Sequence, residues 1–306
     1  MRCLMAWFER LGAACWVGRE RAMERSNGVH LGVTMHSDLV GQNGGVELTA
    51  KQRADWDRSG WLVVRDAFTE AEFSAIDVAV REVESWGDER GLAHFEQTRL
   101  GAVIARSEDF EPHHGFLRSL LRSSIITDTV DALFGEPGVL FKEKINYKHA
   151  GGGGFAPHQD VTAYPQISTC ISVMIPIDPA DTTNGCLWFT TRTPGTTIEN
   201  VRGAIPESWC SEQEWVPVEV SPGDIVFFDG LAPHRSDTNR SQRSRRAMYV
   251  TYNPRSGGDF RNAYYEDKRR RLAEASVGES GNVLISVNDD FLGQPVDASA
   301  SGDITA

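Results

Sequence analysis

Two histidines and one aspartate in this 306-residue chain have the types and the spacing of a metal site. His158 and Asp160 are separated by one residue, so in an extended strand both side chains point to the same face. His234 comes much later, after a turn and the strand-like stretch 224–228, and could complete the set. Two histidines and one carboxylate leave coordination positions open, which suits non-haem Fe(II) that binds a cosubstrate and oxygen together.

Arg245 stands near the start of a further strand-like stretch, residues 247–252. A guanidinium fixed at that position could hold a distal carboxylate through two parallel hydrogen bonds. A His-x-Asp triplet is common by chance, and the later histidine and arginine are what favour the metal interpretation. For the remaining histidines we expect structural roles for His113, His114 and His149, which could also line a pocket, and surface positions for His30, His36 and His94.

The glycine run 151–154 precedes the first of these histidines. A phosphate-binding loop would have to lead into a helix, whereas this run leads into Phe155, Ala156 and Pro157 and a strand. The run therefore predicts a loop and not a P-loop.

The overall charge argues against several classes of partner. The chain has 43 acidic and 31 basic residues and a formal charge of −12, so its surface should repel nucleic acid and anionic membranes. No stretch approaches the ~20 apolar residues of a membrane span. The five cysteines are scattered and form no CxxC pair, which argues against a disulfide framework or a structural zinc site and favours a reducing, cytoplasmic compartment.

The elements that must position these residues fall into two blocks. Helices are predicted at residues 49–58, 70–86 and 119–134, with a strand at 61–64. Short strand-like runs then follow at 139–147, 170–177, 186–190, 216–220, 224–228 and 247–252. Helices first and strands later indicate an α+β fold, with enough strands for a barrel or a double-sheet jelly roll. We expect residues 1–46 to be an N-terminal arm, residues 47–292 the domain, and residues 293–306 a disordered tail.

Several separated motifs resemble the phytanoyl-CoA dioxygenase family of Fe(II)/2-oxoglutarate oxygenases. They are the run 142–148, the glycines 151–154, the run 155–160, Gly223-Asp224 and Pro233-His234, in that order along residues 49–268. The resemblance implies a double-stranded β-helix, a cupin-like jelly-roll barrel with flanking N-terminal helices. It also implies that the protein consumes 2-oxoglutarate and O2 and releases succinate. Because related halogenases replace the metal-binding aspartate with a small residue, and Asp160 is present here, the expected outcome is hydroxylation.

The resemblance also assigns roles to individual residues. His158, Asp160 and His234 would bind iron, and Arg245 would hold the far carboxylate of 2-oxoglutarate. Asn146 and Ser236 would be neighbours of this cosubstrate.

The substrate is expected to be a small anion. Lys142, Lys144 and Lys148 alternate along one predicted strand and so share a face, either to recognise an anionic group or as a solvated edge strand that resists aggregation. The ending 252–268 resembles the branch of the family that hydroxylates aminoalkylphosphonates next to phosphorus. That likeness would place Asn253 and Arg255 with Lys144 around the phosphonate, and Gln159 and Tyr164 in the pocket lining, with an acidic or aromatic group accepting the amine.

Three alternatives remain open at this stage. The protein could be a hydroxylase of the same family that tailors natural products, a catalytically silent metal-binding barrel, or a zinc-dependent hydrolase of cupin type. The presence of both an iron site and Arg245 argues against the silent barrel, which would need neither. A zinc-dependent hydrolase would have no function for Arg245. The oligomeric state does not follow from the sequence.

Overall fold

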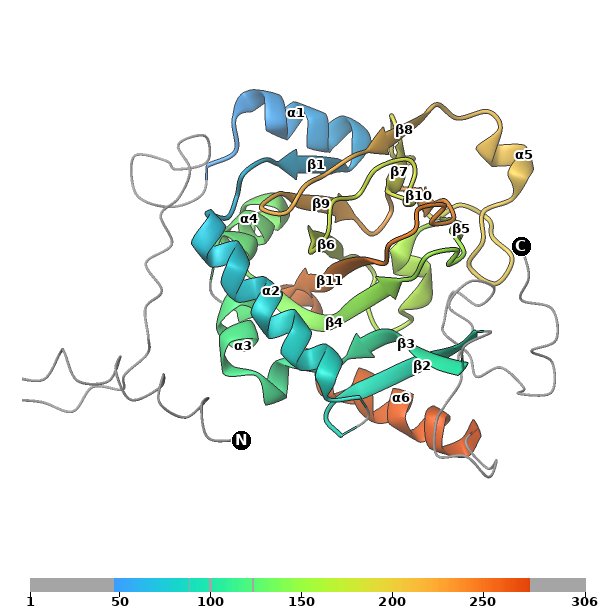
Figure 1. The fold of residues 1–306 in the computed structure, drawn as a ribbon. Coiled ribbons are helices and arrows are strands. Elements are labelled where there is room, and N and C mark those ends of the chain that lie inside the picture. Colours follow the sequence, from blue (N-terminus) through green and yellow to red (C-terminus); the bar gives the residue numbers. More distant parts are fainter. Residues whose placement is uncertain (1–46, 88, 99–100, 123, 276–306) are drawn as a thin grey trace, which may run out of the picture. The chain divides into compact units, whose positions relative to one another are not determined.

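The computed structural model describes residues 47–87, 89–98, 101–122 and 124–275 (Figure 1). The predicted arm at 1–46 and tail at 293–306 lie outside the described residues. No helix in the described ranges combines the length and the apolar character that crossing a bilayer requires.

The N-terminal helices begin and end where their capping residues predict. Thr49 accepts a hydrogen bond from the Gln52 amide in a capping box, α1 (Ala50–Ser59) follows, and Gly60 ends it with a φ of 70°. Thr69 caps α2 (Glu70–Ser85) in the same way.

The prediction of a single helix over residues 119–134 is wrong. The structure has α3 (Gly115–Arg122) and α4 (Ile125–Phe134) instead. Ser124 is extended between them and caps α4, because its hydroxyl accepts from the Ile126 amide.

The strands form two antiparallel sheets. The seven-stranded sheet has the order β1 (Trp61–Val64), β9 (Ile225–Asp229), β6 (Ile171–Pro176), β11 (Arg245–Pro254), β4 (Gly138–Lys148), β3 (Gly101–Glu108), β2 (Leu92–Thr98). The four-stranded sheet has the order β5 (Phe155–His158), β10 (His234–Ser236), β7 (Leu187–Thr190), β8 (Trp215–Val218). The short helix α5 (Glu207–Cys210) precedes β8, and α6 (Arg261–Ala275) follows the last strand.

Each face of the large sheet has its own core. On one face Ile145, Met248 and Val250 pack with α2, α3 and α4 in a cluster that includes Val80 and Leu117. On the other face a second cluster joins the two sheets, through Met174, Phe228 and Ala247 of the large sheet and Leu187, Phe189 and Val218 of the small one. The predicted α+β class and double-sheet jelly roll are confirmed, with the described strands forming two facing sheets and not one closed ladder.

Strand β4 lies in the interior of the large sheet, between β3 and β11. Lys142 and Lys148 on it are buried. The interpretation of these lysines as a solvated edge strand is therefore wrong.

Candidate metal centre and its cavity

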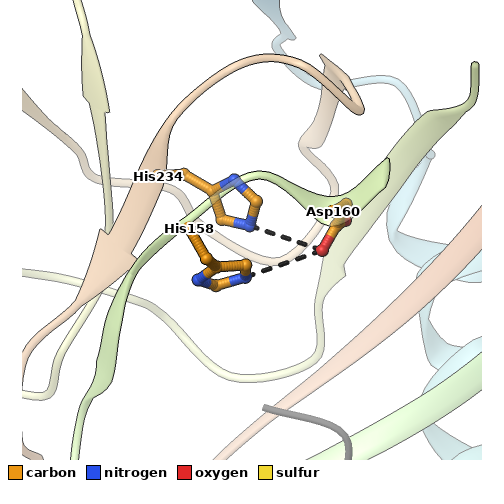
Figure 2. Close-up of side chains that lie close together, drawn as sticks. All are labelled: His158, Asp160 and His234. Carbon is orange, nitrogen blue, oxygen red and sulfur yellow. Dashed lines mark ion pairs between the residues drawn. The ribbon is translucent and has the colours of Figure 1, made fainter. Parts of the chain in front are cut away.

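The three predicted metal ligands come together between the two sheets. His158 ends β5, His234 begins β10, and the two are paired in register. Asp160 lies just beyond β5, in the 3₁₀ turn Asp160–Ala163. Its Oδ1 is 3.6 Å from His158 Nε2 and 3.7 Å from His234 Nε2. Figure 2 marks both pairs with dashed lines. One ligand atom from each of the three lies within 4.8 Å of the others, so a single ion can bind all three.

Backbone carbonyls orient both imidazoles. His158 Nδ1 lies 2.7 Å from the carbonyl oxygen of Ala156, and His234 Nδ1 lies 3.0 Å from that of Ala232. A carbonyl oxygen only accepts, so Nδ1 carries the proton in each ring and the Nε2 lone pair faces Asp160. Burial, and then the neighbouring His158, lower the pKa of His234 to about 3, which keeps that imidazole neutral and able to bind a metal.

Asp160 is held ionised at the centre of the triad. Burial alone would raise its pKa, but the neighbouring imidazoles of His158 and His234 keep it well below the usual range. Its second oxygen, Oδ2, accepts a hydrogen bond of 2.5 Å from Ser172 Oγ on β6. One carboxylate oxygen is thus fixed by the sheet and the other faces the histidines, an arrangement that fits a divalent iron.

The triad opens into a cavity that both sheets line. Besides the triad, its lining comprises Arg106, Lys144, Asn146, Phe155, Ser172, Leu187, Phe228, Arg235, Ser236, Tyr249 and Thr251. Three of these residues are basic, and the only carboxylate among the described lining residues is Asp160. Arg235 is engaged by Asp237 and lies over the rings of Trp188 and Trp215. The cavity therefore suits an anion beside the metal.

Arg245 lies near one end of this cavity, paired in register with Lys148. It is 3% exposed, and within the described chain its Nε and Nη1 have no hydrogen-bond partner. Lys148 donates to Ser236 Oγ at 2.9 Å and to the Asp237 carbonyl at 2.6 Å. Burial, and then the charge of Arg245, lower the pKa of Lys148 to about 7. Unsatisfied buried donors on a guanidinium fit the carboxylate of 2-oxoglutarate, although Arg245 is not itself among the cavity-lining residues.

Three of the other predicted binding residues do line the cavity. Asn146 and Lys144 lie on the same face of β4, and Ser236 lies on β10. Asn146 Oδ1 accepts a hydrogen bond of 3.0 Å from Arg106 Nε. The ammonium group of Lys144 lies 5.3 Å from the centre of the Tyr249 ring.

Gln159 and Tyr164, which the sequence placed in the pocket lining, lie outside it. The Gln159 amide donates to the carbonyls of Thr196 and Leu231 and accepts from the amide of Ile198, so it ties loops together. Tyr164 packs edge-on against Phe141, under the ammonium of Lys142.

Asn253 and Arg255 also lie away from the cavity. Asn253 is buried and donates to the carbonyls of Pro254 and Gly258, which shapes the turn before α6. Arg255 begins the exposed 3₁₀ turn Arg255–Gly257. This geometry gives neither side chain a contact with a ligand beside the triad.

Eight lining residues were not predicted as site residues, namely Arg106, Phe155, Ser172, Leu187, Phe228, Arg235, Tyr249 and Thr251. The last two could have been found, because they continue the alternation that begins at Arg245 on the same strand. Arg106 lies on β3, a strand that was not predicted at all. His94, expected on the surface, is fully buried on the adjoining β2, 3.6 Å from Glu108.

Comparisons with known proteins agree with this geometry. The sequence profile of the phytanoyl-CoA dioxygenase (PhyH) family matches residues 56–247. A methylphosphonate hydroxylase from Gimesia maris is 40% identical over 252 residues, covering 81% of this chain and 97% of that protein. A 2-aminoethylphosphonate dioxygenase from an uncultured bacterium is 32% identical over 257 residues, covering 81% and 98%. The crystal structure of EctD from S. alaskensis with 2-oxoglutarate and 5-hydroxyectoine has a TM-score of 0.62 at 20% identity, covering 73% of this chain and 83% of that one, which shows a shared fold.

Proposed function

This chain belongs to the phytanoyl-CoA dioxygenase family of Fe(II)/2-oxoglutarate-dependent oxygenases, and we propose that it hydroxylates the carbon next to phosphorus in a small phosphonate. The observation that carries the proposal is the buried His158, Asp160 and His234 triad, which opens into a cavity lined by cations. The names of the two relatives, which cover most of this chain, support a phosphonate substrate.

In this proposal the triad holds the iron, and Arg245 holds the far carboxylate of 2-oxoglutarate. Bound iron supplies the oxidising chemistry with 2-oxoglutarate and O2. The residues of the chain hold the metal-binding side chains in place. The Ala156 and Ala232 carbonyls hold the two imidazoles with Nε2 facing inward, and Ser172 fixes the aspartate. Ser236 and Lys148 lie beside Arg245 at the cosubstrate end of the cavity.

For the substrate side we propose Lys144, together with Asn146, which the sequence analysis placed beside the cosubstrate. They follow one another on the cavity face of β4, two positions apart, so that both polar groups point to the same space. Phe155, Leu187 and Phe228 line the same space with apolar groups, which exclude water and leave room for a short alkyl chain. A small phosphonate combines the anionic and apolar parts that such a lining recognises.

We also propose that the protein works in a reducing, cytoplasmic compartment and that nucleic acid is not a partner. Cys170, Cys186 and Cys210, the cysteines of the described residues, are buried and form no disulfide. The formal charge of −12 disfavours binding to polyphosphates.

The test is anaerobic reconstitution with Fe(II), followed by O2 and 2-oxoglutarate, counting succinate with methylphosphonate, 2-aminoethylphosphonate and several carboxylates. We expect succinate to rise with a phosphonate, in step with a hydroxylated phosphonate product seen by ³¹P NMR. The matched control is the same protein loaded with Zn(II). Succinate that rises only with a non-phosphonate would favour a tailoring hydroxylase. An absence of Fe(II)-dependent succinate would favour the silent barrel, or the hydrolase if the Zn(II) protein is active.

A further inference from the structure

Arg106 occupies a central place in the cavity wall. It lies on β3 directly opposite Asn146 of β4, and Glu108, two residues on, lies opposite Lys144. The side chain of Arg106 is buried and lines the cavity. Because Arg106 and Lys144 are diagonal neighbours on adjacent strands, their charged groups share one face of the sheet.

The guanidinium of Arg106 is held through two of its three nitrogens. Its Nε donates to Asn146 Oδ1 at 3.0 Å, and its Nη1 donates to Glu108 Oε1 at 3.3 Å. In the part of the chain that the structure describes, Nη2 has no hydrogen-bond partner. Nε and Nη1 thus hold the guanidinium in place, and Nη2 remains able to donate a hydrogen bond to a ligand in the cavity.

The one carboxylate that Arg106 contacts is shared with other cations. Glu108 also pairs with Lys268 from α6 and lies 3.6 Å from His94. Its negative charge is therefore divided among several groups. Lys268 contributes most to keeping the pKa of Glu108 well below its usual value, against the opposing effect of burial.

The cations of the wall repel one another. Burial, and then the charges of Lys142 and Arg106, lower the pKa of Lys144 well below its usual value. Cationic groups so close that they disfavour one another's charge would be stabilised by an anion between them. An anion with two negative charges would stabilise these cations more than an anion with one negative charge.

We propose that Arg106 and Lys144 hold the phosphonate group from two adjacent strands, and that Arg106 makes the cavity prefer a doubly charged phosphonate over a singly charged anion of the same shape. This inference rests on the proposed function and adds to it a specificity-determining residue. The preference arises because two cationic donors approach the anion from adjacent strands, and they stabilise two negative charges more than the single charge of a sulfonate with the same three oxygens. The Glu108–Lys268 pair fixes Arg106 from behind, so helix α6 helps to position the substrate-binding group.

A purely structural role for Arg106 predicts a different result. In that case its removal would lower stability and leave the discrimination between anions unchanged. The distinguishing quantity is therefore the ratio of affinities for methylphosphonate and for methanesulfonate, which has a similar shape and a single charge.

The experiment compares the wild-type protein with Arg106→Gln, Arg106→Lys and the control Arg118→Gln. Arg118 is a half-exposed arginine that also pairs with a buried glutamate, Glu111, and does not line the cavity. Binding of methylphosphonate and methanesulfonate to the Fe(II)- and 2-oxoglutarate-loaded protein is measured anaerobically by calorimetry. Steady-state succinate formation gives KM for methylphosphonate and for 2-oxoglutarate.

For Arg106→Gln we expect methylphosphonate to bind about 10- to 100-fold more weakly, with a much smaller change for methanesulfonate. The KM for 2-oxoglutarate should stay within about twofold of wild type. Arg106→Lys should recover part of the preference, and Arg118→Gln should match wild type. An Arg106→Gln protein that binds 2-oxoglutarate normally and keeps the wild-type ratio would overturn the inference alone. A wild-type protein that forms succinate but binds no phosphonate would overturn the proposed substrate as well.

Discussion

At the level of single residues, the ligand atoms of the metal centre are oriented by neighbours that do not touch the metal. The carbonyls of Ala156 and Ala232 select the nitrogen that each histidine presents, and Ser172 holds the far oxygen of Asp160. Outer partners of this kind typically change metal affinity by about 10- to 100-fold when they are removed. The loss of metal affinity on removing a ligand can therefore be compared with the loss on removing the residue that orients it.

Asp160→Ala should abolish Fe(II)-dependent hydroxylation and weaken Fe(II) binding by at least about 100-fold, since it removes one of three ligands. Ser172→Ala should weaken Fe(II) binding by about tenfold and retain turnover, because the carboxylate remains and only its support is lost. Anaerobic metal titration and product formation measure the two effects. Substantial hydroxylation by the Asp160 variant would remove Asp160 from the metal centre.

Arg245→Gln should raise the KM for 2-oxoglutarate by about 10- to 100-fold and leave the KM for the phosphonate nearly unchanged, because a buried charged donor to the cosubstrate carboxylate is lost. Arg243→Gln, an exposed arginine two residues earlier, is the control. Both constants come from succinate formation at saturating levels of the other reactant. An unchanged requirement for 2-oxoglutarate would transfer the role to another residue, with Lys148 the first candidate.

At the level of elements, α6 is attached to the large sheet through buried charges, in addition to the packing of Tyr264 on Phe141. Arg261 donates to Glu143 and to Asp109, and Tyr265 donates to the carbonyl of Glu143. Lys268 reaches Glu108 one strand away. Because removing one partner of a buried ion pair leaves the other unpaired, this attachment is sensitive to single substitutions.

Arg261→Leu should lower the free energy of unfolding by about 3–5 kcal/mol, because Glu143 would remain buried without its partner. Arg270→Leu on the same helix removes an exposed arginine that pairs with Asp267 and Glu274, and should cost less than about 1 kcal/mol. Urea denaturation of the two variants gives both values. Equal losses would show that α6 is held by something other than the buried pairs.

His94 on β2 should make stability depend on pH in the acidic range. Burial is the main cause that lowers its pKa to about 3 in the folded protein, from about 6.5 in an exposed histidine. Between these values the unfolded chain binds more protons than the folded protein, so stability falls as the pH drops below 6.5.

This dependence amounts to about 1.4 kcal/mol per pH unit from that one residue. Replacing His94 with Asn should make the plot of unfolding free energy against pH shallower by about that slope between pH 6 and pH 4. Urea unfolding at a series of pH values measures it. An unchanged slope would mean that His94 is protonated, or exposed, in the folded protein.

At the level of the whole molecule, the parts predicted from sequence are those marked by local signals. The triad and Arg245 lie next to turns and strand ends, which the adjacent residues in the sequence predict. Capping residues likewise predicted where α1 and α2 begin. Strand β3 and its residue Arg106 were missed, although β3 pairs with the neighbouring β2 in a hairpin as well as with the more distant β4. Alternation showed that the β4 lysines share a face, but whether that face is buried depended on both neighbouring strands. Asn253 and Arg255 were placed by resemblance, and they lie beyond the bulge at Thr251 and Tyr252, where the chain turns towards α6.

We expect residues 47–292 to contain everything that catalysis requires, as the predicted domain bounds state. A protein of those residues should therefore match the full chain in kcat and in KM for 2-oxoglutarate. Succinate formation at equal protein concentration measures both, with Asp160→Ala in each length as the inactive control. A large loss of kcat in the shorter protein would give residues 1–46 or 293–306 a part in the reaction.

Strand β11 links the proposed cosubstrate end of the cavity to the proposed substrate end by one uninterrupted stretch of backbone. From Arg245 to Tyr249 the strand rises by about 14 Å, at about 3.4 Å per residue, and its pairing with β4 stays in register as far as Thr251. Inserting or deleting one residue in this stretch would move every later side chain to the opposite face of the sheet. During evolution, then, substrate range in this lineage can change by replacing Tyr249 or Thr251, or by altering loops, but not by altering the length of this strand. The length of β11 therefore sets the distance between the proposed cosubstrate site and the proposed substrate site.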